Sequence, residues 1–453
     1  MAISSPAASQ LPTVERRAVL PAGFVAGGTA AGIKASGRPD VALIVATSGP
    51  AAAAAVFTPN AFAAAPVRLS RANLAATSDD ARGGFGFASA VVSTSGCANA
   101  ATGAAGEADQ AEVGRLVAQR LGIDEPRVLH LSTGIIGSRL PLDRVAAGID
   151  AVGAQLRDDD TGLEAAAEAL RTTDSVRKVA TASIVLPAED GVPVPITVTG
   201  IAKGVGMIHP NMATMLSVVL TDAPVAPEVL WDLLRPAAVR TWNQLSVDGD
   251  TSTNDTVFVL ASGVAGAAPV AAGSGAAITL GAAIEAVARD LARQQAADGE
   301  GATILITAAV TGAVDDAEAR AVARAVVSSS LVKAAAHGKD PNWGRIAGAA
   351  GNAVTASAAV LEAAGLAPDD AAGRAGQPAR LDPDRLRISI AGHPVFDGAR
   401  GGPLAFDRAA ARASMDGAEL LIELDLGLGG GTGEAFGCDL TEQYVIENSE
   451  YTT

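Results

Sequence analysis

Cysteine and aromatic side chains are scarce in this chain of 453 residues. The two cysteines, Cys97 and Cys438, form no C-x-x-C pair, which excludes a disulfide scaffold and a cysteine-based zinc site and fits a reducing compartment. Aromatic residues make up only 3% of the chain, which argues against a platform of rings for stacking nucleobases or sugars. The core must therefore be packed closely from small side chains.

Positive charge and long apolar runs are lacking as well. The net charge of -16, with no compensating Lys/Arg run, repels a phosphate backbone, so we expect no nucleic-acid partner. No run of about 18 apolar residues occurs, so we expect no membrane span. The apolar stretch 18–33 is interrupted by Pro21 and four glycines, and we interpret it as mature chain rather than a signal peptide. A cytoplasmic protein is the expectation.

The remaining composition is that of a globular α/β or α+β protein. Apolar residues make up 49% and charged residues 18%, and the length predicts two or more subdomains. Gly/Pro/Ala-rich breaks fall at 266–277 and 365–383, and the second is the better candidate for a subdomain linker, or else a long surface loop. Short β-branched runs alternate with Ala-rich helical patterns. The runs that we expect to be strands are 41–47, 88–94, 128–132, 179–186, 196–201, 303–307, 386–390 and 420–426.

Helical periodicity marks three further segments. Apolar residues fall on one helical face in 113–121, and Gly122 stands where a helix C-terminus favours glycine. The same pattern recurs in 280–291. The segment 315–333 has acidic residues in its first turn, which stabilise a helix N-terminus, and we expect one helix there.

Several motifs fail on inspection. The glycine-rich run 427–437 has no G-x-G-x-x-G frame and predicts a tight backbone turn. The segment DGDTSTND, 248–255, starts like a calcium loop but has Thr253 and Val259 where Gly and Glu are needed; it predicts a polar turn or a hydrogen-bonding loop beside a polar substrate. Ser330-Leu-Val-Lys333 matches S-x-x-K without its companion motifs, and we interpret it as a solvated helix face. The four histidines lack metal-ligand spacing, so no metal site is expected.

Polar, glycine-punctuated segments remain that are unlike plain core. They are AAVFTPN (54–60), SGCANAATG (95–103), STGIIG (132–137), TTD (172–174), KGVGMIHPNMATML (203–216), DGEGAT (298–303), HGKDPNWGRI (337–346) and NSEYTT (448–453). With these segments in this order and approximate spacing, the chain resembles the ornithine acetyltransferase family, also called glutamate N-acetyltransferases, over nearly its full length.

The resemblance implies a fold and a maturation step. The implied fold is a layered αββα-type sandwich of the ornithine acetyltransferase and DmpA-like aminopeptidase type, with a smaller C-terminal α+β subdomain from about residue 310. In that family the precursor cuts itself within the MATML block, which here is the bond between Ala213 and Thr214. The products implied are an α chain, 1–213, and a β chain, 214–453, that stay associated, with a dimer of αβ units as the assembly.

Thr214 is thereby implied as the nucleophile. A threonine hydroxyl needs a base, and a chain that begins with threonine carries one in its own α-amino group, whose pKa is roughly 7.7 to 8.0. The resemblance implies that Thr214 takes acetyl from N2-acetylornithine, releases ornithine and passes the acetyl group to glutamate. Thr133 and Gly134 are implied as the oxyanion hole. Judged without the resemblance, Thr214 follows a Pro-Asn turn and predicts a helix start, which it can still be after the cut.

Substrate contacts are implied residue by residue. Lys203 suits a substrate carboxylate and Glu300 an amine, although a surface ion pair is the alternative for both. Thr173 adjoins Thr172 and competes with it for its role. The full set implied is Thr172, Lys203, Thr214, Glu300, Asn448 and Thr453.

The chain also departs from the family pattern. The usual N-S-G-N-A-N stretch is here Thr94-Ser-Gly-Cys-Ala-Asn99, so that Thr94 and Cys97 replace amides, and we expect altered hydrogen bonding near the oxyanion hole. The resemblance implies no metal and no bound cofactor, with acetyl-CoA only as an alternative donor if the enzyme is bifunctional. Two other functions stay open: an amidase or aminopeptidase on the same scaffold, and a non-catalytic amino-acid-binding relative.

Overall fold

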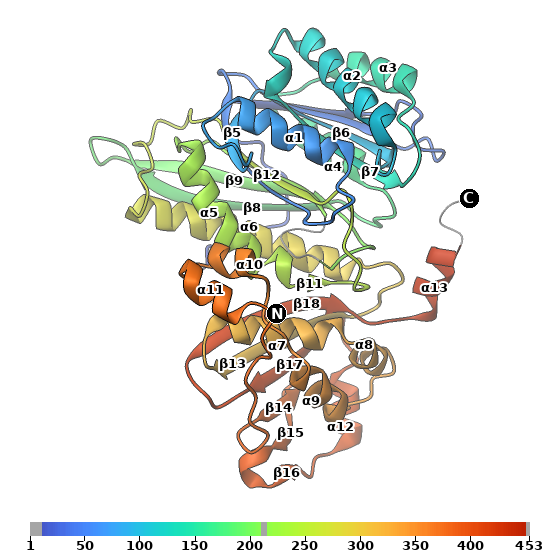
Figure 1. Ribbon diagram of the computed structural model, residues 1–453, viewed down its shortest axis with the longest axis vertical. Coiled ribbons are helices and arrows are strands. Elements are labelled where there is room, and N and C mark those ends of the chain that lie inside the picture. The colour runs from blue at the N-terminus through green and yellow to red at the C-terminus, as the bar shows by residue number, and fades with distance from the viewer. Residues whose placement is uncertain (1–10, 210–214, 450–453) are drawn as a thin grey trace.

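The computed structural model describes residues 11–209 and 215–449 (Figure 1). Two stacked sheets form the larger part of the molecule, and a third sheet forms the smaller part below them in the view. In order across the first sheet, the described strands are β1 (Val14–Glu15), β8 (Lys178–Pro187), β9 (Pro193–Lys203), β10 (Leu216–Thr221), β12 (Thr256–Ala261), β4 (Ala51–Phe57) and β5 (Phe85–Ala88). Those of the second sheet are β2 (Phe24–Thr29), β3 (Val41–Ala46), β6 (Ala90–Cys97) and β7 (Val128–Ile135).

The side-chain period of the strands explains the stacking. In β10, Leu216, Val218 and Leu220 belong to the core between the two sheets, whereas Val219 belongs to the core on the opposite face. A strand covered on both faces is a continuous apolar run, because successive side chains point to opposite sides. The apolar run that follows Thr214 is therefore a buried strand.

Helices cover both outer faces. The second sheet packs against α2 (Gly103–Leu121) and α3 (Leu142–Gly153), and the first packs against α5 (Pro227–Arg240) and α6 (Gly275–Ala297). Side chains of α1 (Ala65–Ala76) and α4 (Asp160–Leu170) join the core between the sheets. The order of layers is helix, sheet, sheet, helix, which confirms the predicted αββα sandwich.

The layers approach closely because their side chains are small. Strand β4 presents a buried run from Ala51 to Ala55. Helix α4 lies directly on β2: a Cβ atom at Gly28 would stand 2.1 Å from the carbonyl oxygen of Ala165. Close packing of small residues replaces the aromatic side chains that the sequence lacks.

The third sheet lies under the sandwich and mixes parallel with antiparallel pairs. In spatial order its described strands are β11 (Leu245–Ser246), β18 (Gly431–Cys438), β13 (Leu305–Ala313), β17 (Glu419–Asp425), β14 (Arg387–Ile390), β15 (His393–Asp397) and β16 (Gly402–Pro403). The helices described in this part are α7 (Asp316–Ser328), α8 (Ser330–His337), α9 (Trp343–Gly351), α10 (Ala358–Ala363), α11 (Pro368–Arg374), α12 (Arg408–Ser414) and α13 (Glu442–Ser449). This is the α+β part that the resemblance implies.

Most predicted strands and helices are confirmed, and Gly122 caps α2 with a φ of 69°. The single helix predicted at 315–333 is wrong. The chain breaks at Ser329, whose hydroxyl accepts a hydrogen bond from the Val332 amide and so begins α8. The predicted acidic N-terminus is confirmed, because the Asp315 carboxylate caps the first turn of α7.

Three smaller predictions are corrected. Lys333 is not on a solvated face: it is buried, and its Nζ donates to the carbonyl oxygens of Ser246 and Cys438 at 3.2 and 2.8 Å. The glycine-rich run 427–437 turns only at its start and then continues as strand β18. The proposed linker 365–383 contains α11 and joins α10 to β14 within the smaller part.

The predicted helix start at Thr214 falls outside the described residues, and the residues that follow it form a strand rather than a helix. The described chain resumes at Met215, and β10 starts at Leu216. Its pairing with β9 and β12 satisfies its backbone groups from the first residue. Ala213 and Thr214 themselves lie outside the described residues, as does Thr453.

Candidate active site

A cavity of about 290 Å³ lies where the ends of several elements of the sandwich meet. Every predicted site residue that the structure describes lines it, and so do Ile208 and Met215, which lie on either side of the residues around Thr214. These predicted residues are Thr133, Gly134, Thr172, Lys203, Glu300 and Asn448. Segments more than 300 residues apart in sequence therefore converge on one small pocket.

Thr133 and Gly134 occupy the end of β7, where its pairing with β6 is irregular. Gly134 has a φ of 129°, and a Cβ atom there would lie 2.3 Å from the carbonyl carbon of Gly96. Any side chain at this position would collide with the β6 backbone. The strand end thus keeps a bare backbone next to the Thr133 hydroxyl, the pair of groups predicted for the oxyanion hole.

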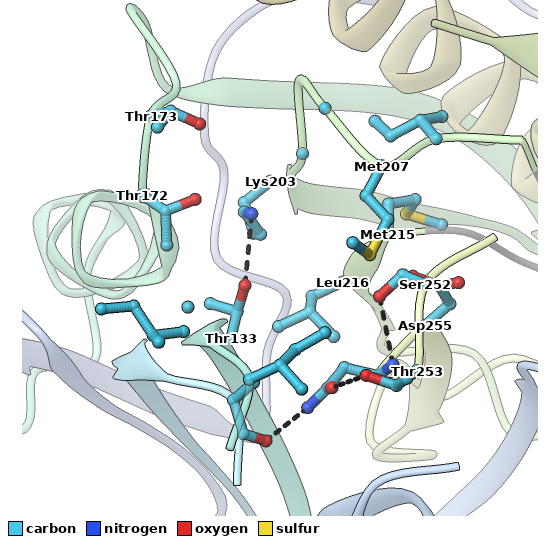
Figure 2. A pocket seen from close by; sticks show the side chains of 18 of the residues that line it. Thr133, Thr172, Thr173, Lys203, Met207, Met215, Leu216, Ser252, Thr253 and Asp255 are labelled. Atoms are coloured by element: carbon cyan, nitrogen blue, oxygen red, sulfur yellow. Dashed lines mark hydrogen bonds between the residues drawn. The ribbon is translucent and has the colours of Figure 1, made fainter. Parts of the chain in front are cut away.

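Lys203 stands at the end of β9 and points at Thr133 (Figure 2). Its Nζ donates to Thr133 Oγ1 at 3.3 Å. Because the hydroxyl oxygen accepts this bond, the hydroxyl hydrogen remains available to a pocket oxygen. Burial lowers the pKa of Lys203, and the nearby Asp174 and Glu300 carboxylates partly offset this. Only 8% of Lys203 is exposed, so the alternative of a surface ion pair is wrong for this residue.

Glu300 lines the same pocket, just beyond the end of α6. Its carboxylate accepts hydrogen bonds from the Thr173 hydroxyl at 2.9 Å and from Asn448 Nδ2 at 2.9 Å. The pocket therefore has a cationic side at Lys203 and an anionic side at Glu300. Both Thr172 and Thr173 line it, and Thr173 is the one that contacts Glu300.

Asn254, which the sequence did not single out, connects several pocket segments by hydrogen bonds. Its Nδ2 donates to the carbonyl oxygens of Ala98 and Ser132 at 2.7 and 2.8 Å, and its Oδ1 accepts from the Thr253 hydroxyl at 2.7 Å. Asn254 thereby fixes the carbonyl group that precedes Thr133. The signal was present in the polar segment 248–255, whose last four residues line the pocket.

Histidine is absent from the described lining of the pocket. His209 lies nearby, with Nδ1 3.1 Å from the Ser246 hydroxyl, and burial together with the charges of Arg324 and Lys333 lowers its pKa to about 4. A group of that pKa is a weak base at neutral pH. A hydroxyl nucleophile in this pocket needs another base.

The two residues that stand in place of the family's amides, Thr94 and Cys97, do not line the pocket. The Thr94 hydroxyl lies 2.9 Å from the Ser132 hydroxyl, one residue before Thr133. The Cys97 thiol donates to the Ser138 carbonyl oxygen at 3.0 Å and packs in the core beneath α2 and α3, where burial raises its pKa. The expected change in hydrogen bonding near the oxyanion hole is therefore the contact of Thr94 with Ser132, the residue before Thr133.

In residues 11–209 and 215–449, no group of three or more His, Cys, Asp or Glu side chains is arranged to hold a metal ion. No helix in these ranges is long and apolar enough to cross a bilayer.

Fold and pocket together define a class: an αββα sandwich with a small polar pocket that is lined by a lysine and a glutamate and that places a hydroxyl beside a bare strand end. The sequence pattern of the ArgJ family matches residues 25–453. The arginine biosynthesis bifunctional protein ArgJ of Thermus thermophilus is 43% identical over 96% of this chain and 99% of its own length. The protein of that name from a Synechococcus strain is 44% identical over 96% of both chains. The chain belongs to the ArgJ family, which confirms the resemblance stated from the sequence.

Two solved structures are also similar. The arginine biosynthesis bifunctional protein of Bacillus halodurans is 37% identical with a TM-score of 0.45, over 52% of this chain and 99% of that one. The Mycobacterium tuberculosis ornithine acetyltransferase, solved with ornithine, is 38% identical with a TM-score of 0.38, over 44% of this chain and 97% of that one.

Proposed function

We propose that this protein transfers an acetyl group from N2-acetyl-L-ornithine to L-glutamate through an acetyl-Thr214 intermediate. The observation that carries the proposal is the convergence of Thr133, Lys203 and Glu300 on a pocket that Met215, the residue after Thr214, also lines. The names of the relatives, which refer to arginine biosynthesis and to ornithine, support the same reaction.

Maturation is the first step. The Thr214 hydroxyl attacks the carbonyl carbon of Ala213, the C–N bond breaks, and water hydrolyses the resulting ester to leave a carboxylate on Ala213 and a free amine on Thr214. The new α-amine is the base for the Thr214 hydroxyl, and no histidine among the described lining residues competes for that role. The α chain, 1–213, and the β chain, 214–453, remain together because β9 and β10 pair along their length.

Substrate binding follows from the two charged sides. The Lys203 ammonium takes the α-carboxylate of acetylornithine, and the Glu300 carboxylate takes its side-chain amine. Thr172, Asn448 and Thr453 complete the contacts to the substrate. Lys203 likewise holds glutamate by its α-carboxylate, with its α-amine free to attack.

Transfer then proceeds in two matched halves. The Thr214 oxygen attacks the acetyl carbonyl, its proton passes to the α-amine, and the C–N bond of the amide breaks as ornithine leaves with that proton. The amine of glutamate attacks the ester and gives up a proton to the α-amine of Thr214, which passes it to the Thr214 oxygen as the C–O bond breaks and acetylglutamate leaves. Each tetrahedral oxyanion is stabilised by the Thr133 hydroxyl and the Gly134 N–H. The kinetics are ping-pong.

The remaining assignments complete the proposal. No metal and no bound cofactor take part, acetyl-CoA is an alternative donor if the enzyme is bifunctional, and the assembly is a cytoplasmic dimer of αβ units. The direct test is to incubate the protein with acetylornithine, with and without glutamate. We expect acetylglutamate to form in step with ornithine. Ornithine release that ignores glutamate would establish the amidase alternative instead.

A further inference from the structure

Behind the pocket lies a buried cluster of charge that the proposed mechanism does not use. The Lys178 ammonium is in contact with two carboxylates, Asp174 Oδ1 at 2.7 Å and Asp298 Oδ2 at 2.6 Å. The side chains of Lys178 and Asp174 have no exposed surface, and that of Asp298 is 13% exposed. Removing three charges from water is costly, so such a cluster persists only where its geometry is well satisfied.

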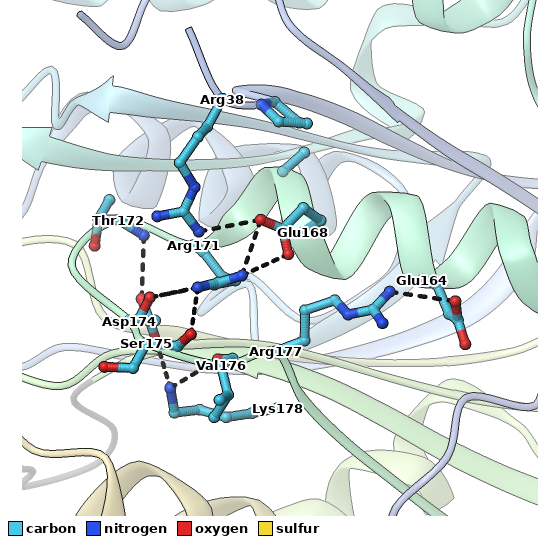
Figure 3. A network of polar contacts seen from close by, with 12 residues as sticks. Arg38, Glu164, Glu168, Arg171, Thr172, Asp174, Ser175, Val176, Arg177 and Lys178 are labelled. Atoms are coloured by element: carbon cyan, nitrogen blue, oxygen red, sulfur yellow. Dashed lines mark hydrogen bonds and ion pairs between the residues drawn. The ribbon is translucent and has the colours of Figure 1, made fainter. Parts of the chain in front are cut away.

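Each carboxylate also accepts hydrogen bonds from backbone amides in or next to the pocket lining, and Figure 3 shows the bond from the Thr172 amide to Asp174. The Asp174 carboxylate accepts from the Thr172 amide at 3.1 Å and from the Gly204 amide at 2.8 Å. Gly204 follows Lys203 in the chain, so one carboxylate joins the Thr172 wall to the Lys203 wall. Burial alone would raise the pKa of Asp174, but the charges of Lys178 and Lys203 and the hydrogen bonds from Lys178 and the Gly204 amide outweigh it, so the net pKa is lowered and the carboxylate is ionised at neutral pH.

Asp298 likewise binds backbone next to the pocket, on the side where Glu300 lies. Its carboxylate accepts from the Ser175 amide at 3.0 Å, two residues beyond Thr173, and it stands two residues before Glu300. Lys178 is the shared partner that holds Asp174 and Asp298 together. Lys178 therefore connects the segment that carries Lys203 with the segment that carries Glu300.

We propose that Lys178, held between Asp174 and Asp298, is a positioning residue that sets the spacing between Lys203 and Glu300 and so selects a ligand with a carboxylate and a distant amine. This inference rests on the proposed function for the identity of the ligand. Lys178 does not line the pocket, so it acts only through the walls that it joins.

The test compares a two-ended substrate with a one-ended one. N2-acetylornithine carries both charged groups, whereas N2-acetylnorvaline has the same carbon chain without the terminal amine. The measured quantity is the ratio of kcat/KM for the first to kcat/KM for the second. Partial unfolding lowers both values equally and leaves the ratio unchanged, so a merely structural role does not move it.

In Lys178→Met we expect this ratio to fall about tenfold or more relative to wild type, which corresponds to about 1.4 kcal/mol of lost discrimination. Lys178→Arg, which keeps a cation between the carboxylates, is expected to restore most of it. Asp298→Asn removes one charge while keeping an acceptor for the Ser175 amide, and it carries the test if Lys178→Met fails to fold. An unchanged ratio in folded Asp298→Asn and Lys178→Met would overturn the proposal.

A matched control is available in the same molecule. Arg289 and Glu434 form a two-bond ion pair between α6 and β18, with side chains 15% and 7% exposed, and neither lines the pocket. Arg289→Met is expected to lower stability and leave the ratio at its wild-type value. If wild type releases no ornithine at all, the proposed function fails, and the dissociation constants of ornithine and norvaline replace kcat/KM in the same comparison. Their ratio then supports or overturns the role of Lys178 without turnover.

Discussion

Two clusters of buried charge show how similar chemistry serves different ends in this molecule. In the sandwich, Lys178 joins carboxylates whose neighbours in sequence are pocket residues. In the smaller part, the buried Glu318 accepts from Arg374 at 3.1 Å and from Arg380 at 2.7 Å, and it fastens the segment after α11 to α7. None of these three lines the pocket.

The two clusters differ in what they hold: the carboxylates bound by Lys178 hold segments that line the pocket, whereas Glu318 holds segments that do not. Both clusters satisfy their charges with near neighbours, so burial alone does not separate them. Among the residues described, the smaller part contributes only Asn448 to the pocket lining, from the terminal helix α13. We therefore expect substitutions near the pocket to change catalysis and those around Glu318 to change stability.

Thr214→Ala should have the largest effect. Without the hydroxyl there is neither a nucleophile for the Ala213 carbonyl nor an acceptor for the acetyl group, so the chain stays whole and transfer is lost. Thr214→Ser, which keeps a hydroxyl, should still cut. Intact mass and ornithine release measure both outcomes, and a cut, active Thr214→Ala protein would remove the assigned nucleophile.

Thr133→Ala should come second. Losing one oxyanion donor typically slows a reaction by a factor on the order of 10² to 10³, and both self-cleavage and acetyl transfer use this donor. The control is Thr181→Ala, which removes another buried hydroxyl, one that donates to the Arg17 carbonyl oxygen away from the pocket. Normal kinetics in Thr133→Ala would take this residue out of the site.

The pH dependence should show a smaller, graded effect. The Thr214 amine must be neutral to accept a proton, so kcat/KM rises with pH through roughly 8. Lys203 must be charged, so kcat/KM falls again as the pH rises and Lys203 loses its proton. Because burial lowers the pKa of Lys203 from 10.5, the midpoint of this alkaline limb lies below pH 10.5. Lys203→Arg keeps its charge at higher pH, so its alkaline limb should move upward. A limb that stays in place would show that another group titrates.

Arg374→Met should leave catalysis at its wild-type level. Glu318 would lose one of its two partners, which lowers the free energy of unfolding by about 1–3 kcal/mol. Denaturant unfolding measures the stability and kcat/KM measures the activity. A large loss of activity in folded protein would break the distinction between the two clusters.

Much of the fold was predictable because local patterns and tertiary packing agree. The apolar runs of β3 and β7 are buried where they were expected, and Gly122 caps α2. The errors arose where packing overrides local pattern. Lys333 sits on a helix but reaches two carbonyl groups of other strands, which no spacing along the sequence reveals.

The residues that line the candidate site were predictable from the sequence, but the residues that hold them in place were not. The polar segments around Thr133, Lys203 and Glu300 carried the resemblance, and the pocket brings them together. Asn254 and Lys178 were missed because their partners are distant backbone groups and carboxylates. Such roles depend on three-dimensional contacts, and a single sequence gives residue types without them.

The most direct test of the account is the mass of the protein quenched after exposure to acetylornithine without glutamate. We predict two chains, with one acetyl group on the chain that begins at Thr214, and loss of that group when glutamate is added. A single chain of 44.8 kDa, or a cut protein that releases ornithine without ever carrying acetyl, would contradict it.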